Sequence, residues 1–541
     1  MGDPVDHVGL CGGPVNATVQ APEASSHPRV IWGRAPLVDG CLALVLFVVS
    51  LMIRRRSVTT DGLIYDDAWV VAGIRAARLG EIFTVSTNHP GFSTGLKLWG
   101  TLTSVDSRGF TWPVLVVGSA SASILYLAVR KLGVRPSVAW VVSTLLVTAP
   151  VHIMYSARIK PYVFEGVLVT ILAAMVPAVA RRQWTPRFAA AWLSAMVIIG
   201  TFSAFSLVAT AVASLVLATE SREDRRVRFC GLAIQGVLQV LYLRTVQSHF
   251  NSALVAENWG AVYDGYPDVR LPLSDLFGEI DLHLSRTGSL LGNVDSRFAT
   301  VLVLVAMFGL ALSGWGRRRD PGARLVAVLF VIAIAGSVVK QIPFGPALGN
   351  PVFPGGRAMI WLLPGICIGL ALAIEQLLAR AAKPKLVSGA AAAFLFLLGA
   401  AVLVSNGDIR NAYPSTGSAT SVAFVRAHMA PDARLILANG THSFAAEGGR
   451  FIAKSDPSSE IGFRLLSESG QVWDMGIDPW NQSTDAVEER IGDARVAVVY
   501  NGFVGFGDAQ VPALEKALKA LGFEAEYRRG AFMTQVSVWE R

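Results

Sequence analysis

Two adjacent carboxylates, Asp66 and Asp67, lie in a polar segment directly after the first long apolar run of the chain. A carboxylate can act as a general base, which takes the proton of a hydroxyl group as that hydroxyl forms a new bond. At helical spacing Asp66 shares a face with Val70 and Gly73, so it is predicted to point toward the protein. Two alternatives stay open. Asp is a favoured N-cap residue, and Asp66 with Asp67 could hold a divalent cation.

Basic side chains near the ends of later apolar runs could supply the matching positive charge. Arg158 and Lys160 lie in the segment MYSARIKPYVFEG, and Arg357 lies in FPGGRAMIWLLPG. Lys97 and Lys340 are further candidates. Arginine binds phosphate through paired hydrogen bonds, and such cations stabilise charge that develops on a leaving phosphate. The alternative for each residue is a basic side chain that snorkels at a helix end. Because such basic residues recur at the ends of several apolar runs, a shared anion-binding site is favoured.

Two more positions carry polar groups that suit substrate recognition. His89 precedes Pro90 in a predicted turn, where it could orient a phosphate or a sugar hydroxyl, or be an ordinary surface histidine. In the polar stretch 248–297, aromatic residues stand beside carboxylates, and Asp264 is the best candidate there for a substrate contact. Such a mixture suits carbohydrate binding, but it also suits an ordinary loop at a membrane interface.

The composition places these residues in a membrane protein. Of the 541 residues, 52% are hydrophobic and 16% are charged, a balance typical of a polytopic membrane protein and not of a soluble one. The net charge of +8 does not indicate nucleic-acid binding, because the Arg and Lys residues cluster at the ends of apolar runs. None of the four cysteines lies beyond Cys367, so the last part of the chain has no disulfide framework.

Apolar runs predict about eleven transmembrane helices, because a span needs roughly 20 apolar residues. Residues 1–35 form a polar tail without the short apolar core of a cleavable signal, and residues 36–405 form the predicted membrane domain. The pair at 188–220 could be one long tilted helix or two short ones. The spans are expected near 37–53, 109–129, 137–156, 162–180, 188–203, 204–220, 227–247, 298–315, 324–341, 358–378 and 386–405.

Clusters of basic residues predict the orientation of these spans, because Lys and Arg are enriched on the cytoplasmic side. Such clusters follow every even-numbered span from the second to the tenth. The N-terminus is then cytoplasmic, and the loops 54–108 and 248–297 are external. The run Arg54-Arg55-Arg56 disagrees with this bias. We expect it at the headgroup level, as an interfacial anchor or as a ligand of lipid phosphate.

Residues 406–541 are predicted to form a separate extracytoplasmic domain, in which helical and strand-like segments alternate. Such alternation is typical of a small α/β domain. The predicted fold class is therefore an all-α polytopic membrane domain with a small C-terminal α/β domain. The piece NGFVGFG (501–507) lacks the Gly-Lys-Ser/Thr ending of a phosphate loop and is expected to be a turn. Helices are expected near 418–429, 459–469 and 511–521, and strands at 434–439, 495–502 and 534–540.

Three short motifs resemble the GT-C superfamily of membrane glycosyltransferases. The chain looks most like the branch with protein O-mannosyltransferases, lipid A aminoarabinose transferases and actinobacterial arabinofuranosyltransferases. The resemblance covers the whole membrane part and extends more weakly to the C-terminal domain. The family often has glutamate, proline and tyrosine where this chain has Asp67, Gly91 and Ala358. The motifs are the pair Asp66-Asp67, the turn His89-Pro90, and the segment Arg158–Tyr162 followed by Arg357 ahead of Leu362-Leu363-Pro364.

The resemblance implies that a sugar is transferred, with inversion, from a polyprenyl monophosphate carrier on the outer face of the cell membrane. The acceptor would be an envelope glycan, lipid or protein, and the sugar could be arabinofuranose or mannose. No resident cofactor is implied, beyond a possible divalent cation at the acidic pair. By this resemblance Asp66 is the base, and Arg158, Lys160 and Arg357 face the donor phosphate. With the other candidate residues added, the expected site has Asp66 and Asp67 as catalytic carboxylates, Arg158, Lys160, Arg357, His89 and Lys97 at the donor phosphate, and Tyr162 and Asp264 at the substrate.

Two other classes of protein remain as alternatives. A multi-pass transporter or a flippase of lipid-linked sugars would carry ionisable residues within its spans and often shows inverted repeats. Here the charges lie mostly at span ends, no internal repeat is evident, and Lys340 and Glu375 are the nearest exceptions. The other alternative is a non-catalytic assembly or sensor protein whose exported domain binds a partner.

Overall fold

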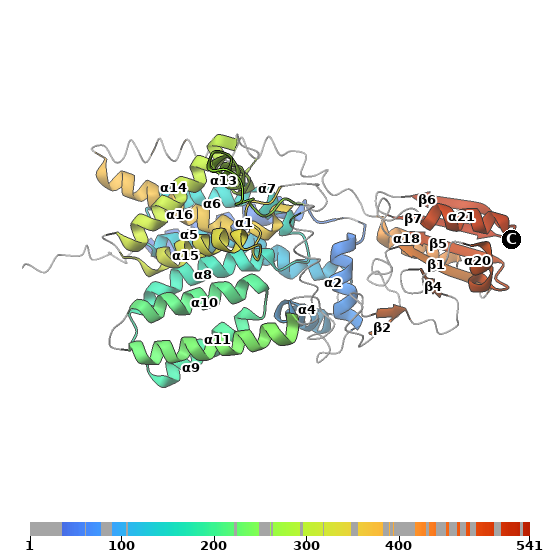
Figure 1. Ribbon diagram of the computed structural model, residues 1–541, viewed down its shortest axis with the longest axis horizontal. Coiled ribbons are helices and arrows are strands. Elements are labelled where there is room, and N and C mark those ends of the chain that lie inside the picture. Colours follow the sequence, from blue (N-terminus) through green and yellow to red (C-terminus); the bar gives the residue numbers. More distant parts are fainter. Residues whose placement is uncertain are drawn as a thin grey trace, which may run out of the picture.

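A bundle of helices and an α/β domain make up the described part of the chain in this computed structural model (Figure 1). The described residues are 35–59, 61–76, 89–103, 106–220, 224–247, 260, 263–292, 296–316, 319–347, 355–381, 389, 393, 417–428, 432–439, 451–453, 463–465, 472–475, 483–501, 510–530 and 534–541. The expected fold class, a helical membrane domain with a C-terminal α/β domain, is confirmed. The expected boundary at 405/406 lies outside the described residues.

The described part of the bundle consists of α-helices and a few short 3-10 turns. In chain order these elements are α1 (Ala35–Arg55), α2 (Tyr65–Ala76), α4 (Pro90–Thr103), η1 (Arg108–Phe110), α5 (Thr111–Lys131), α6 (Pro136–Thr148), α7 (Pro150–Tyr155), α8 (Tyr162–Ala180), α9 (Pro186–Gly200), α10 (Ala204–Glu220), α11 (Arg225–Gln247), α13 (Leu273–Gly288), η3 (Ser289–Leu291), α14 (Ser296–Trp315), α15 (Pro321–Val338), η4 (Gly355–Met359) and α16 (Leu362–Arg380).

Six helices are long and apolar enough to cross a membrane, counted over the described residues only. They are α1, η1 continued by α5, α8, α14, α15 and α16. The apolar helices α6, α9 and α10 are shorter, and α11 is a 23-residue helix outside both groups. The span expected at 386–405 falls, apart from residues 389 and 393, in the part of the chain that is not described.

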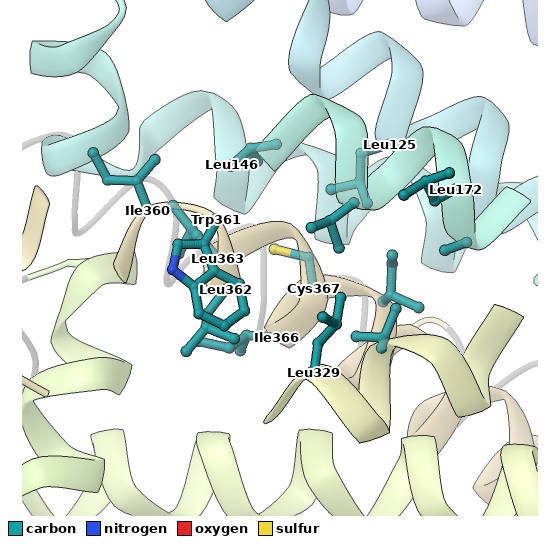
Figure 2. Close-up of a cluster of buried hydrophobic side chains, with 14 of the residues drawn as sticks. Leu125, Leu146, Leu172, Leu329, Ile360, Trp361, Leu362, Leu363, Ile366 and Cys367 are labelled. Carbon is teal, nitrogen blue, oxygen red and sulfur yellow. The ribbon is translucent and has the colours of Figure 1, made fainter. Parts of the chain in front are cut away.

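Helix α16 forms the centre of the bundle, and α1 lies at its edge. The apolar window of α16 is 78% buried inside the protein, whereas that of α1 is 17% buried. Figure 2 shows the α16 side chains Leu363 and Cys367 packed among Leu125, Leu172 and Leu329 from three other helices. A helix that is apolar all round is buried in this way when other apolar helices surround it.

The pair of runs at 188–220 forms two helices rather than one long helix. Helix α9 ends at Gly200 and α10 begins at Ala204. The backbone carbonyl of Thr201, which a continuous helix would have used itself, accepts a hydrogen bond from the Gly91 amide at 3.0 Å. A Cβ at Gly91 would lie 2.9 Å from the Thr201 carbonyl carbon, so this approach needs glycine. The start of α4 therefore packs directly on the break between α9 and α10.

Polar side chains tie the helix ends together at the end of the bundle away from α2. The buried guanidinium of Arg228 donates to the carbonyls of Leu217, Ala180 and Arg182, which are last-turn or following residues of α10 and α8. Arg135 pairs with Glu375 at 3.1 Å, which joins the start of α6 to the last turns of α16. The Arg228 contacts satisfy backbone carbonyls that helix termini leave without partners.

The C-terminal domain is built on a five-stranded sheet with the order β4-β1-β5-β7-β6. Strands β4, β1 and β5 run parallel, and β7 is antiparallel to both β5 and β6. A separate pair, β2 and β3, is antiparallel. The elements are α18 (Ser418–His428), β1 (Ala433–Asn439), β2 (Phe451–Ala453), β3 (Phe463–Leu465), β4 (Val472–Asp474), α20 (Thr484–Ile491), β5 (Val496–Asn501), α21 (Gln510–Ala520), β6 (Glu524–Gly530) and β7 (Gln535–Glu540).

Alternate residues of the strands pack on opposite faces of the sheet, as the period of two requires. Leu435 and Val498 pack with α18 on one face, whereas Ile436 and Val499 pack with α20 and α21 on the other. The expected helices near 418–429 and 511–521 and the three expected strands are confirmed. The helix expected near 459–469 is wrong, because residues 463–465 pair as a strand with β2. Of the turn expected at 501–507, only residue 501, the end of β5, is described.

The C-terminal domain contacts the segment that leads into α2. The carboxylate of Asp61 accepts hydrogen bonds from the Thr420 amide at 3.1 Å and from the Thr420 hydroxyl at 2.8 Å. The Leu63 carbonyl accepts a bond from the Ser418 hydroxyl at 3.3 Å. Asp61 thus caps the first turn of α18 from a distant part of the chain, and α2 lies between the bundle and the sheet (Figure 1).

Replacing Asp61 with alanine is expected to loosen this contact, because the first-turn amide of α18 loses its carboxylate acceptor. Losing a capping side chain costs about 0.5–2 kcal/mol. Hydrogen exchange should therefore rise in residues 418–428 while the bundle keeps its protection. Ser483→Ala removes the N-cap of α20 in the same domain and should raise exchange at α20 alone. Unchanged exchange at α18 in Asp61→Ala would contradict this role.

Candidate active site

Two ion pairs bring the acidic pair of α2 together with the segment between α7 and α8. Lys160 Nζ lies 2.9 Å from Asp66 Oδ1, and Arg158 Nε lies 2.8 Å from Asp67 Oδ2. The two pairs differ in their access to solvent. The side chains of Arg158 and Asp67 are 2% and 4% exposed, whereas those of Lys160 and Asp66 are 13% and 21% exposed. Asp66 can therefore be reached by another molecule, and Asp67 is sealed inside.

Local structure explains how α2 presents both carboxylates. The helix begins at Tyr65, so Asp66 and Asp67 lie in its first turn and not at its N-cap. Ala68, Val71 and Ala72 are completely buried and fix the inner face of the helix. Negative charge in a first turn is favoured by the helix dipole. Both side chains nevertheless bond to distant cations, so the N-cap alternative does not describe their contacts.

The two cations that pair with these carboxylates lie on a short irregular segment between two helices. Helix α7 ends at Tyr155 and α8 begins at Tyr162. Between them the Lys160 amide donates to the Arg158 carbonyl at 2.8 Å, a tight turn that presents both cationic side chains to α2. Pro161 is the N-cap residue of α8 and ends the turn, because proline has no amide hydrogen to donate to a further turn hydrogen bond.

The surroundings separate the acidities of the two carboxyl groups. Burial acts to raise the pKa of Asp66, but the charges of Lys160, Arg158 and Arg357 outweigh it and hold that pKa below its ordinary value. At Asp67 burial, together with the charge of Asp66, prevails over Arg158 and Lys160, and the pKa is raised. Asp66 is therefore the carboxylate that stays ionised and able to accept a proton near neutral pH.

Arg357 adds a third cation, held by aromatic rings. Its guanidinium lies over the ring of Tyr263 at 5.2 Å, a favourable cation–π contact. Burial acts to lower the pKa of Arg357, but Tyr162, Tyr155 and Asp66 raise it overall. The rings of Tyr155 and Tyr162 meet edge to face at 5.2 Å. Three cations and two carboxylates thus share one site, with positive charge in excess.

The other predicted residues have different surroundings. Asp264 pairs with Arg286 at 2.9 Å, is more than half exposed, and has a positive φ of 48°. The Lys97 ammonium donates to the Arg75 carbonyl at the last turn of α2, at 3.2 Å. His89 is half-buried directly before α4, and its carbonyl accepts a bond from the Ser93 amide. The residues that the structure brings together are Asp66, Asp67, Arg158, Lys160, Arg357 and Tyr162.

Sequence reasoning missed three neighbours of this site. Tyr263 reaches Arg357 from the second long loop, in which the adjacent residue, Asp264, was the expected substrate contact. Tyr155 was not considered. Glu165, one turn into α8, is 5% exposed and acts electrostatically on Tyr162. A carboxylate inside an apolar run was the signal for Glu165, because burying such a group needs a reason.

The acidic pair is a poor fit for a divalent cation as it stands. Hard cations take six or more oxygen ligands, several of them carboxylates. Here a lysine and an arginine already neutralise Asp66 and Asp67. Across the described residues, no group of three or more His, Cys, Asp or Glu side chains is placed to hold a metal ion.

Comparisons with known proteins give distant structural similarities and no match by sequence. No protein-family model matches the chain, and no curated protein matches it. Its structure is similar to that of ArnT from Cupriavidus metallidurans in the apo state, with a TM-score of 0.41, 13% identity, and coverage of 94% of this chain and 98% of that one.

The second similarity is to the oligosaccharyltransferase of Archaeoglobus fulgidus. In the apo form it gives a TM-score of 0.46 at 12% identity, covering 85% of this chain and 69% of that one. With zinc and sulfate it gives 0.43 at 10% identity, covering 92% and 72%. Similarities of this size carry no functional assignment, which must come from the residues of this chain.

Proposed function

We propose that this chain is an inverting glycosyltransferase, which moves a sugar from a polyprenyl-phosphate carrier to an acceptor hydroxyl. The observation that carries the proposal is the state of Asp66. It is an accessible carboxylate whose pKa is kept low by surrounding cations, and positive charge exceeds negative charge around it. A base for a hydroxyl and a binding site for a phosphate leaving group are the two groups that this reaction needs.

In the proposed reaction the acceptor oxygen attacks the anomeric carbon of the sugar from the face opposite the phosphate. The new bond between carbon and acceptor oxygen forms as the bond between carbon and phosphate oxygen breaks, which inverts the configuration. The electron pair of the broken bond leaves with the polyprenyl phosphate. The acceptor proton passes to Asp66, which later releases it to water. The products are the glycosylated acceptor and free polyprenyl phosphate.

The cations have two tasks in this scheme. Before the donor binds, Lys160 neutralises Asp66 at 2.9 Å. A donor phosphate would compete for Lys160 and for Arg357, which frees Asp66 to receive the acceptor proton. Arg158 remains tied to Asp67, and this buried pair fixes α2 against the segment that carries Lys160. Cations fixed in place before the reaction stabilise the departing phosphate without having to reorganise.

The orientation predicted from the basic residues puts this site on the outer face of the cell membrane. There the donor would be a lipid-linked arabinofuranose or mannose, and the acceptor an envelope glycan, lipid or protein. The C-terminal domain contacts the segment before α2 through Asp61 and Thr420, which would let it position the acceptor beside Asp66. His89, Lys97, Tyr162 and Asp264 remain proposed contacts to donor or acceptor.

Two features of the structure argue against the alternative of a transporter. Glu375 is paired with Arg135 near the last turn of α16, and Lys340 is exposed after the end of α15. The two residues that the sequence marked as possible midspan charges are therefore helix-end residues. A transporter would need ionisable groups along a path through the spans.

The function is tested with the purified protein in nanodiscs. Polyprenyl-phosphate arabinofuranose and polyprenyl-phosphate mannose are supplied separately, each with candidate envelope acceptors. We expect glycosylated acceptor and free polyprenyl phosphate in equal amounts from one donor. Two results together would overturn the proposal: no transfer from either donor, and no binding of polyprenyl phosphate. Movement of a donor across proteoliposomes without product would instead favour the transporter.

Replacing Lys160 with methionine is expected to shift the acid limb of the kcat/KM profile to higher pH. The base works only when ionised, so activity falls as the pH drops through the pKa of Asp66. Lys160 is the leading cation that lowers this pKa, and its removal leaves burial less opposed, so the pKa rises. The pH–rate profile measures the shift. Lys131→Met, which removes an exposed lysine at the far end of α5, should leave the limb in place. If the acid limb of the kcat/KM profile does not move in Lys160→Met, Asp66 is not the group whose titration sets that limb.

A further inference from the structure

Arg54, the penultimate residue of α1, is completely buried, and its partners among the described residues are all uncharged. It was expected at the lipid headgroups, but its exposed fraction is 0%. Its guanidinium donates to the Ser156 hydroxyl at 3.0 Å and to the Leu146 and Val147 carbonyls at 3.1 and 3.3 Å. It also lies 2.8 Å from His152 Nδ1. A buried cation without a counter-ion is costly, so its retention calls for a specific role.

The reason for this environment is a break in the third predicted span. Pro150 has no amide hydrogen, so it cannot donate to the Leu146 carbonyl four residues earlier, and Ala149 is extended. The expected span at 137–156 is thus two helices, α6 and α7. Arg54 supplies hydrogen bonds to the carbonyls that the break leaves open, and so joins α1 to the end of α6.

The same guanidinium also holds the segment beyond the break. The Ser156 hydroxyl receives its bond from Arg54, and Ser156 lies two residues before Arg158. Helix α5 packs against the other side of Ser156. The approach is so close that a Cβ at Gly118 would lie only 2.5 Å from Cβ of Ser156. Ser156 is therefore held between Arg54 and the backbone of α5, at the start of the turn that presents Arg158 and Lys160.

We propose that Arg54 is a positioning residue, which sets the Arg158–Lys160 turn against α2 through Ser156. The inference rests on the proposed function for its kinetic consequence, but its structural content stands apart from it. Arg54 touches no reacting group. It acts by replacing the helical hydrogen bonds lost at Pro150 with a rigid, multidentate brace, a task that the planar guanidinium suits and lysine does not.

Arg228 offers a matched control at the opposite end of the bundle. It is 2% exposed, and it also donates to three backbone carbonyls at helix ends. Removing either guanidinium leaves carbonyls unsatisfied and should destabilise the fold to a similar degree. Only Arg54 is joined to the segment that carries the site cations, so a purely structural role would give both variants the same result.

The experiment compares Arg54→Met, Ser156→Ala and Arg228→Met by hydrogen exchange in nanodiscs, and by donor kinetics. Loss of a charge-assisted hydrogen bond should raise exchange of the 156–160 amides by about tenfold or more in the first two variants. Arg228→Met should raise exchange near residues 180–184 and 217–220 instead. In Ser156→Ala, KM for the donor should rise about tenfold with kcat reduced less than about threefold, since the turn binds donor phosphate in both ground and transition states.

Unchanged exchange of residues 156–160 in Ser156→Ala would overturn the proposal, and so would an equal rise of donor KM in Arg228→Met. If Arg54→Met does not fold, Ser156→Ala decides, because it removes the connection and keeps the buried guanidinium. If the wild-type protein neither transfers sugar nor binds polyprenyl phosphate, the proposed function fails on its own, and the exchange measurement still tests Arg54.

Discussion

Replacing Asp66 with asparagine is expected to lower kcat for sugar transfer by about 10²–10⁴-fold, the usual contribution of a general base. Asparagine has nearly the same shape but cannot accept the acceptor proton. Donor binding should be preserved or tightened, because Lys160 no longer has a carboxylate at 2.9 Å that competes with the phosphate. A fall in kcat without a rise in donor KM separates this role from a loss of binding.

The measurement is turnover of the lipid-linked donor by purified wild-type and variant proteins, matched for folding by thermal unfolding. Asp106→Asn is a suitable control, since Asp106 is an exposed carboxylate in the same loop region and pairs with Arg108. It should retain near wild-type activity. An Asp66→Asn protein that turns over at the wild-type rate would exclude Asp66 as the base, and the sealed Asp67 would not be a ready substitute.

The second large effect is on stability and concerns the pair Asp67–Arg158. Replacing Arg158 with methionine leaves the Asp67 carboxylate buried without its 2.8 Å partner. Removing one member of a buried ion pair costs about 3–5 kcal/mol. We expect a loss of that order in the free energy of unfolding, together with loss of transfer, since the cation that holds α2 to the site is gone.

A second variant distinguishes this cause from a general packing defect. Asp67→Leu combined with Arg158→Met removes both charges and fills the space with apolar atoms, which is often neutral for stability. The double variant should recover most of the lost free energy of unfolding. A double variant as unstable as Arg158→Met would show that the pair does not interact as the geometry indicates, since a double-mutant cycle isolates that coupling.

These two results would divide the acidic pair into a catalytic and a structural member. Asp66 is accessible and has a lowered pKa, whereas Asp67 is sealed and has a raised pKa. The two residues are adjacent and chemically identical. Their difference comes from which side of α2 faces the bundle, because neighbouring residues on a helix point about 100° apart.

The sequence alone determined the fold class of the protein and most of the charged residues of its candidate site. Long apolar runs predicted the helices of the bundle, because the cost of leaving backbone groups unsatisfied in lipid forces such runs to be helical. Alternating patterns predicted most elements of the C-terminal sheet. Charges placed against the prevailing pattern, at Asp66, Arg158, Lys160 and Arg357, predicted a site, because charges at a membrane are kept only where something requires them.

Only the tertiary structure decided which of these residues meet and where the helices break. The break between α9 and α10 depends on Gly91, more than a hundred residues earlier in the chain, which bonds to Thr201. The burial of Arg54 depends on carbonyls that Pro150 leaves open in another helix. Tyr263 rather than Asp264 meets Arg357. Local patterns record only neighbours within a few turns, whereas each of these contacts joins residues distant in sequence, so packing of the whole chain fixes them.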